Sequence, residues 1–180
     1  MALLRGINVG GRNVVRMADL RAAFEDAGYE AVGTYIQSGN VLFESALPPA
    51  SLESDIERLL ADRFGLSVVV VVRSHRQYRE VVDRAPHGFG TAPDTYHSDV
   101  IFLKAPLSSS EAIRVVDPRN GVDQVWPGEG VLYFSRLSER LSRSRMSRIA
   151  GSPLYQSMTI RNWRTTTKLL SLLDQRVEED

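Results

Sequence analysis

The sequence contains no cysteine among its 180 residues. Disulfide scaffolds, thiolate zinc sites and a cysteine nucleophile are therefore excluded, and nothing in the composition requires an oxidising compartment. Long apolar runs are also missing, since no stretch approaches the roughly 20 consecutive apolar residues that a membrane-spanning helix needs. The start of the chain lacks the pattern of a signal peptide. We therefore expect a cytoplasmic protein with no membrane partner.

An excess of charge of either sign is absent, because 22 Lys and Arg balance 22 Asp and Glu. No overall field therefore draws the chain towards nucleic acid or a membrane. The charge is unevenly spread, however, because Glu139 is the single acid in a segment with eight basic residues: Arg136, Arg140, Arg143, Arg145, Arg148, Arg161, Arg164 and Lys168. The last three residues are acidic, and we expect residues 178–180 to form a solvated tail.

Catalytic motifs are scarce. The three histidines, His75, His87 and His97, show no i, i+4 metal-binding pair, and the chain has no Gly-x-Ser-x-Gly elbow. Asp94 and Asp99, which lie near His97, are most simply loop and strand-edge residues. The sequence therefore predicts no metal site and no cofactor, and it leaves open whether the protein is an enzyme.

What the sequence does contain is 43% apolar residues, enough to build real cores. Their spacing in the first half predicts the order strand, helix, hairpin, helix, strand. The expected elements are a strand over 2–5, a helix over 17–27 ended by Gly28, strands over 31–37 and 41–44 around a Ser38-Gly39-Asn40 turn, a helix capped by Ser51 and ended by Gly65, and a strand over 68–72. This β-α-β-β-α-β order is typical of a ferredoxin-like unit.

The second half repeats this order after a linking helix, which a capping box of Ser74 and Gln77 begins. The expected elements are a strand over 99–103, a helix opened by a Ser108 and Glu111 capping box, strands over 124–126 and 131–134, a helix within 142–150, a strand over 158–161 and a final helix capped by Asn162. We therefore predict an α+β fold of two ferredoxin-like βαββαβ repeats packed together, plus a C-terminal helix. The segments are 1–73, 74–97 for the linking helix and loop, 98–161, and 162–180 for the C-terminal helix and acidic tail.

Five consecutive valines, Val68 to Val72, place apolar groups on both faces of one strand. The helices of a single ferredoxin-like unit cover only one face of its sheet. We therefore expect the two repeats to pack against each other, or a partner subunit to cover the second face.

The segment from Leu3 to Asn13 joins a strand to a helix, where backbone N–H groups can bind phosphate. It lacks the Lys-Ser/Thr ending of a P-loop, and its glycines do not have the dinucleotide-binding spacing. These residues support a tight structural turn and a ligand-binding loop about equally. The candidate ligand-binding residues here are Arg5, Gly6, Asn8, Gly10 and Gly11.

Two polar residues at the tip of the first hairpin, Gln37 and Asn40, are further candidates for ligand binding. Tyr35 lies close to them in the sequence. The structural alternative is strong, because an Asn that follows Gly39 is a good turn residue on local grounds alone.

The basic block near the C-terminus is the best case for anion recognition. It lies at the amino end of the final helix, whose dipole favours negative charge. A solvated, charged helix face is the alternative interpretation. The candidate residues are Arg161, Asn162, Arg164 and Lys168.

The most distinctive stretches of the chain are Leu3 to Asn13, Met17 to Arg21, Thr34 to Val41 and Thr159 to Leu169. They resemble the signatures of the bacterial family known as domain of unknown function 1697. The resemblance implies a fold of two similar ferredoxin-like units and no established activity. Members of that family usually have a few more residues before the first signature, which predicts a truncated first strand.

The leading functional hypothesis is a binding module for a phosphate-bearing small ligand or nucleic acid. It depends on the Gly6 to Gly11 loop meeting the Arg161 to Lys168 block in space. One alternative is a small-molecule enzyme with a cleft between the repeats, in which Arg5, Gln37 and Asn40 orient the substrate. The other is a protein-interaction scaffold that forms a homo-oligomer.

Overall fold

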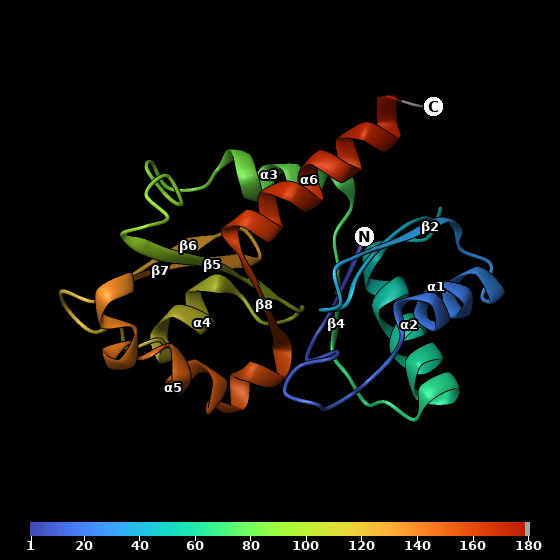
Figure 1. Cartoon of the computed structure of the whole chain (residues 1–180), viewed down its shortest axis with the longest axis horizontal. Coiled ribbons are helices and arrows are strands. Elements are labelled where there is room, and N and C mark those ends of the chain that lie inside the picture. Colours follow the sequence, from blue (N-terminus) through green and yellow to red (C-terminus); the bar gives the residue numbers. More distant parts are fainter. Residues whose placement is uncertain (179–180) are drawn as a thin grey trace. The chain divides into compact units, whose positions relative to one another are not determined.

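The computed structural model describes residues 1–178, and Figure 1 shows it coloured along the sequence. The chain divides into two compact units, of which the first spans Met1–Arg76 and the second begins at Gln77. Each unit contains one four-stranded sheet with helices. None of the described helices is long and apolar enough to cross a bilayer. Glu179 and Asp180 of the expected acidic tail lie outside the described residues.

The first unit has the order β1 (Ala2–Leu4), α1 (Met17–Asp26), β2 (Glu30–Tyr35), β3 (Asn40–Glu44), α2 (Pro49–Phe64) and β4 (Val70–Val72). Its strands lie in the order β2-β3-β1-β4, and each neighbouring pair is antiparallel. This is the arrangement of a ferredoxin-like βαββαβ unit, which confirms the prediction from the order of the elements.

The core of the first unit lies between its sheet and the two helices α1 and α2. Phe24 of α1 and Ile56 of α2 belong to the same buried cluster as Leu4 and Val41. The apolar residues of both helices recur at helical spacing, so that each helix presents one stripe to the sheet. Val71 of β4 points to the opposite face and is also buried. Both faces of the valine strand are thus apolar and buried, and the packing of the two repeats on each other stays a prediction.

Two local predictions in the first unit are wrong. Ser51 does not cap α2, which begins at Pro49 after Pro48. A proline is favoured in the first helical turn because its missing N–H would have no intrahelical partner there. Asn40 was expected in the turn between the two strands and instead begins β3, and the residues with positive φ in that turn are Ile36 (50°) and Gly39 (74°).

The second unit repeats the same order with β5 (Tyr96–Leu103), α4 (Ser109–Val115), β6 (Asp123–Gly128), β7 (Val131–Leu137), α5 (Met146–Ala150) and β8 (Met158–Asn162). Its strand order is β6-β7-β5-β8, and all neighbours are antiparallel. The helix α3 (His75–Asp83) leads into the unit and α6 (Trp163–Glu178) follows it. Two short 3-10 helices, η1 (Ser138–Arg143) and η2 (Pro153–Ser157), flank α5.

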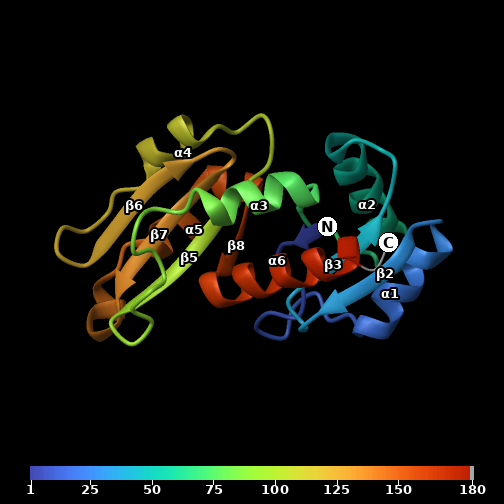
Figure 2. The same ribbon diagram turned by 90° about the horizontal axis from the view of Figure 1, so that it is seen from above.

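Both faces of the second sheet are covered by helices of its own unit. Figures 1 and 2 show α4 and α5 on one face and α3 and α6 on the other. Ile149 of α5 belongs to the buried cluster of Phe134, and on the opposite face Tyr78 of α3 stacks on Phe102 with ring centroids 5.5 Å apart. All six residues from Ser98 to Leu103 of β5 are therefore buried, as is typical of a strand with two covered faces.

The predicted caps of the second unit are confirmed. Ser108 and Glu111 form a reciprocal capping box, with Ser108 N donating to the Glu111 carboxylate at 3.0 Å. The Asn162 side chain accepts from Thr165 N at 2.7 Å and so caps α6. These caps fix where α4 and α6 begin, and the second one places the basic block at the start of α6.

Candidate functional site

The glycine-rich segment after β1 folds into a small hairpin. Asn8 N donates to Asn13 O and Arg12 N donates to Val9 O, both at 3.1 Å. Gly10 and Gly11 form the turn with φ of 59° and 73°, which is typical of a tight two-residue hairpin turn. A Cβ on either glycine would meet no atom within 4 Å, so backbone conformation and not close packing favours glycine here.

The Asn8 side chain braces this hairpin against two other segments. Its Nδ2 donates to Val15 O and to Gln37 O, both at 2.9 Å, and its Oδ1 accepts from Val15 N at 2.8 Å. Asn13 Nδ2 donates to Gly6 O at 3.1 Å in the same hairpin. The two asparagines of the segment thus form hydrogen bonds that hold the loop in place.

The hairpin tip between β2 and β3 is held in a similar way. Asn40 is completely buried, and its Nδ2 donates to Tyr35 O at 3.0 Å. A Cβ on Gly39 would lie 2.8 Å from Leu4 Cβ, so only glycine fits. The Gln37 side chain is exposed and Arg5 is partly buried. Among the candidates of the first unit, Gln37 therefore offers the most accessible polar side chain.

In the second unit, Arg161 is an interior residue and only 6% exposed. Its Nη1 donates to Thr159 Oγ1 at 2.9 Å and to Ile160 O at 2.8 Å. Burial lowers the pKa of Arg161 to about 10, while the nearby phenols of Tyr78 and Tyr155 partly oppose that change. This guanidinium is therefore bonded inside the protein and is not presented at the surface.

Three arginines of the basic run, Arg136, Arg145 and Arg148, are paired with acids that lie elsewhere in the chain. Asp99 binds Arg136 at 2.6 Å. Asp117 binds both Arg145 and Arg148, the latter at 2.7 Å. Counting charges along the run could not reveal these pairs, because the acids come from β5 and from the loop after α4.

Two of the predicted cations remain open at the surface. Arg164 and Lys168 are exposed, lie one helical turn apart on α6 and form no ion pair with any residue between 1 and 178. Arg143 has the same character in η1. The start of α6 therefore carries uncompensated positive charge next to the amino end of a 16-residue helix.

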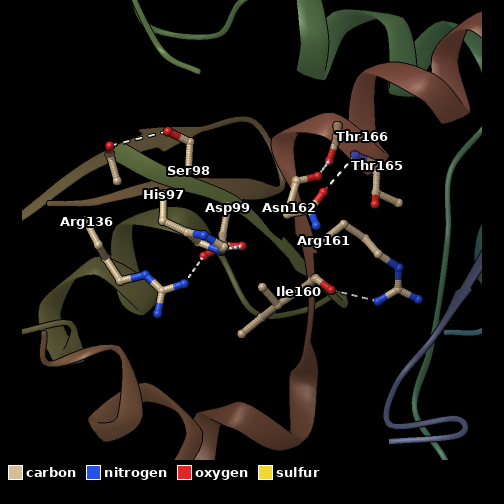
Figure 3. A network of polar contacts seen from close by, with 10 residues as sticks. His97, Ser98, Asp99, Arg136, Ile160, Arg161, Asn162, Thr165 and Thr166 are labelled. Atoms are coloured by element: carbon tan, nitrogen blue, oxygen red, sulfur yellow. Dashed lines mark hydrogen bonds and ion pairs between the residues drawn. The ribbon is translucent and has the colours of Figure 1, made fainter. Parts of the chain in front are cut away.

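A cluster that sequence analysis missed lies at the start of β5 and the end of β7 (Figure 3). His97 Nε2 lies 3.4 Å from one oxygen of Asp99, and Arg136 Nη2 lies 2.6 Å from the other. His97 and Asp99 share one face because they are two residues apart on a strand, and Arg136 lies directly opposite His97. The signal in the sequence was the His-x-Asp spacing, which becomes informative once the strand is extended to Tyr96.

The side chains of this cluster differ in how deeply they are buried. The Asp99 side chain is 6% exposed, whereas that of His97 is 45% exposed. Burial raises the pKa of Asp99, and the charges of Arg136 and His97 oppose that rise. A carboxylate that faces Nε2 leaves Nδ1 of the imidazole available to solvent. An exposed, oriented imidazole of this kind is suited to proton transfer.

The predicted candidates divide between the two units. Arg5, Gly6, Asn8, Gly10, Gly11, Gln37 and Asn40 belong to the first unit, and Arg161, Asn162, Arg164 and Lys168 belong to the second. Their meeting in one site stays a prediction. In the described part of the chain, no group of three or more His, Asp or Glu side chains could hold a metal ion.

Comparisons with known proteins agree with this description. Residues 1–133 match the model of a family described as a protein of unknown function, DUF1697. Among solved structures, the chain is similar to the conserved bacterial protein SP0830 from Streptococcus pneumoniae, with 27% sequence identity, 96% of both chains covered and a TM-score of 0.79. No curated protein matches. The C-terminal stretch that resembles the family's second signature lies beyond the matched residues.

Proposed function

Since the chain belongs to the DUF1697 family, whose description carries no activity, we propose a function from its own residues: binding of a phosphate-bearing ligand at the start of α6. The observation that carries the proposal is the contrast within the basic run. Arg136, Arg145 and Arg148 have acidic partners, whereas Arg164 and Lys168 remain exposed and unpaired within residues 1–178.

The geometry of α6 supports an anionic ligand. Residues four apart on a helix lie about 6 Å apart along its axis, so one phosphate group or two adjacent ones can contact both cations. The helix dipole adds a favourable term near the first turn. Arg161 and Asn162 are assigned supporting roles, because the first is buried and the second caps α6.

Charge reversal tests this proposal. Binding of inorganic phosphate, pyrophosphate, a nucleoside triphosphate and a short oligonucleotide would be followed by NMR chemical-shift perturbation and calorimetry at two salt concentrations. We expect Arg164→Glu with Lys168→Glu to abolish binding and its salt dependence.

Arg143→Glu is the matched control, because Arg143 is also an exposed, unpaired arginine of the second unit. It should leave binding unchanged. Equal losses in the control and in the double variant would indicate a general charge effect, and an absence of perturbation around α6 with all four probes would overturn the proposal.

A second candidate function is acid–base catalysis by His97, which the 3.4 Å contact with buried Asp99 supports. In this role, Asp99 holds the imidazole and Arg136 neutralises the carboxylate's second oxygen. A screen of hydrolysable phosphate and carboxylate esters would detect turnover. His97→Gln should remove that turnover and His87→Gln, in the exposed loop after α3, should not.

A further inference from the structure

The outer edge of the first sheet carries backbone groups that do not face another strand. β4 lies at the end of the strand order, beside β1. Arg73 N donates to Met1 O at 3.0 Å, and Arg5 N donates to Val69 O at 2.9 Å. Bonded and non-bonded pairs alternate in an antiparallel ladder, so the N–H groups of Val70 and Val72 point away from β1. Such outward groups are a template on which another strand can add.

Two carboxylates of α2 accept hydrogen bonds from these outward N–H groups. Val70 N donates to Glu57 Oε1 and Val72 N donates to Glu53 Oε1, both at 2.9 Å. The spacings match, because four residues of helix rise about 6 Å and two residues of strand rise about 6.6 Å. Successive turns of α2 therefore meet alternate residues of β4.

Arg73 donates a hydrogen bond to an outward carbonyl of the same edge, that of Val72. Its Nη1 donates to Val72 O at 2.8 Å and lies 3.8 Å from Glu53 Oε1. The side chains of Arg73 and Glu53 are only 13% and 8% exposed. Burial lowers the pKa of Arg73, while Glu53 acts in the opposite direction. Donors and an acceptor of the edge are thus both satisfied by side chains of the same unit.

We infer that Glu53, Glu57 and Arg73 form an edge clamp that closes a strand-docking surface on β4, and that the strand it excludes is β4 of a second copy of this chain. Val68 to Val72 consists of five uncharged, β-branched residues, a composition that favours strand pairing and aggregation. Two such strands in antiparallel pairing would form a continuous valine ladder. The clamp competes with this pairing by occupying the groups that it needs.

The test replaces the two clamp glutamates of the full-length chain, first one and then both. Amide hydrogen exchange at Val70 and Val72 is measured by NMR at low concentration, and the oligomeric state by light scattering over a concentration series. In Glu57→Ala we expect exchange at Val70 to rise about tenfold, which corresponds to the loss of about 1.4 kcal/mol of hydrogen bonding. In the double variant Glu53→Ala with Glu57→Ala we expect a dimer that increases with concentration.

Two controls separate the clamp from general effects on α2. Asp62→Ala removes an exposed acid from the same helix and should change neither readout. Glu53→Gln with Glu57→Gln keeps the acceptor oxygens without the charges, and should remain a monomer with protected Val70 and Val72 amides.

The inference is overturned if Val70 exchange in Glu57→Ala equals that of the native protein, or if the double variant exchanges faster yet stays monomeric at every concentration. If the double variant does not fold, Glu57→Ala decides alone, since Glu57 is only partly buried. Faster exchange at Val70 that slows as the protein concentration rises then supports the inference, and faster exchange that does not depend on concentration overturns it.

Discussion

The two units share one element order and one strand order but hold their loops with different chemistry. In the first unit, neutral amides of Asn8, Asn13 and Asn40 bind backbone groups of the two hairpins. In the second, Asp123 accepts the backbone N–H groups of Arg119 and Arg145, at 3.0 and 2.9 Å. The shared strand order thus constrains where the loops begin and end. It does not constrain which polar side chains hold the loops in place.

The units also differ in how the second face of the sheet is covered. The second sheet has α4 and α5 on one face and α3 and α6 on the opposite face (Figure 2). The first sheet has only two helices of its own, α1 and α2, and both pack on the same face. A βαββαβ unit by itself has two helices and covers one face. All three residues of β1 are buried as well, whereas β5 is longer and has six consecutive buried residues, Ser98 to Leu103, between its two pairs of helices.

The largest effect is expected at Gly39, where the hairpin of the first unit touches β1. Gly39→Ala places a Cβ 2.8 Å from Leu4 Cβ at a φ of 74°, and we expect a loss of about 3 kcal/mol from overpacking and backbone strain. Urea denaturation followed by circular dichroism measures it. Gly10→Ala is the control, because it has a similar φ and open space, and it should cost about 1 kcal/mol. Equal costs would refute the close-packing argument.

A slightly smaller effect is expected at Asp99 in the second unit. Asp99→Ala leaves Arg136 without its carboxylate, and we expect a loss of about 2 to 3 kcal/mol, less than for a fully buried pair because the Arg136 side chain is 19% exposed. The two tryptophans, Trp126 and Trp163, both lie in this unit, so their fluorescence reports its unfolding. The double variant Asp99→Ala with Arg136→Ala should recover part of the loss, and no recovery would mean that the pair does not interact.

Asn8 tests the neutral brace of the first unit. Asn8→Ala removes three hydrogen bonds, and we expect a loss of about 2 kcal/mol that does not change with salt, because no charge is involved. Gln37→Ala is the matched control, since Gln37 contributes its backbone oxygen and not its side chain to this brace. A strong salt dependence of the Asn8 effect would contradict the contrast between the two units.

The smallest effect is expected at Tyr133, whose hydroxyl donates to Val81 O at 2.6 Å. Burial raises the pKa of Tyr133 to about 12, from an ordinary value of 10.0. The unfolded chain therefore loses this proton at a lower pH than the folded chain, so that stability falls as the pH rises above about 10. Tyr133→Phe should cost about 1 kcal/mol at neutral pH and flatten this alkaline fall. An identical slope in the variant would mean that other groups cause it.

Periodicity and turn residues predicted most of the fold, because they act over a few neighbouring residues. The helix expected over 17–27 is observed as α1 (Met17–Asp26), and the helix expected to end at Gly65 is observed as α2, which ends at Phe64. The predicted ends of the elements were less accurate at two places, one set by a proline and the other by strand pairing. Pro49 begins α2 two residues before Ser51, and pairing with β7 extends β5 back to Tyr96.

The candidate site was less predictable, since its properties depend on partners that lie far apart in the sequence. Arg161 was expected at a basic surface and is instead buried. Asp99 was expected to be a strand-edge residue and instead binds His97 and Arg136. Sequence spacing places side chains on a face, but it does not say which charges from other strands will oppose them.

The sequence by itself therefore determined the two repeats, the caps of α4 and α6 and the basic residues at the start of α6, because helical and strand periods are local properties of the chain. Only the tertiary structure decided which arginines are neutralised, which asparagines brace the loops and how Glu53 and Glu57 meet β4. These features require strands and helices distant in sequence to come within hydrogen-bond distance, and only the packing of the folded units brings them that close.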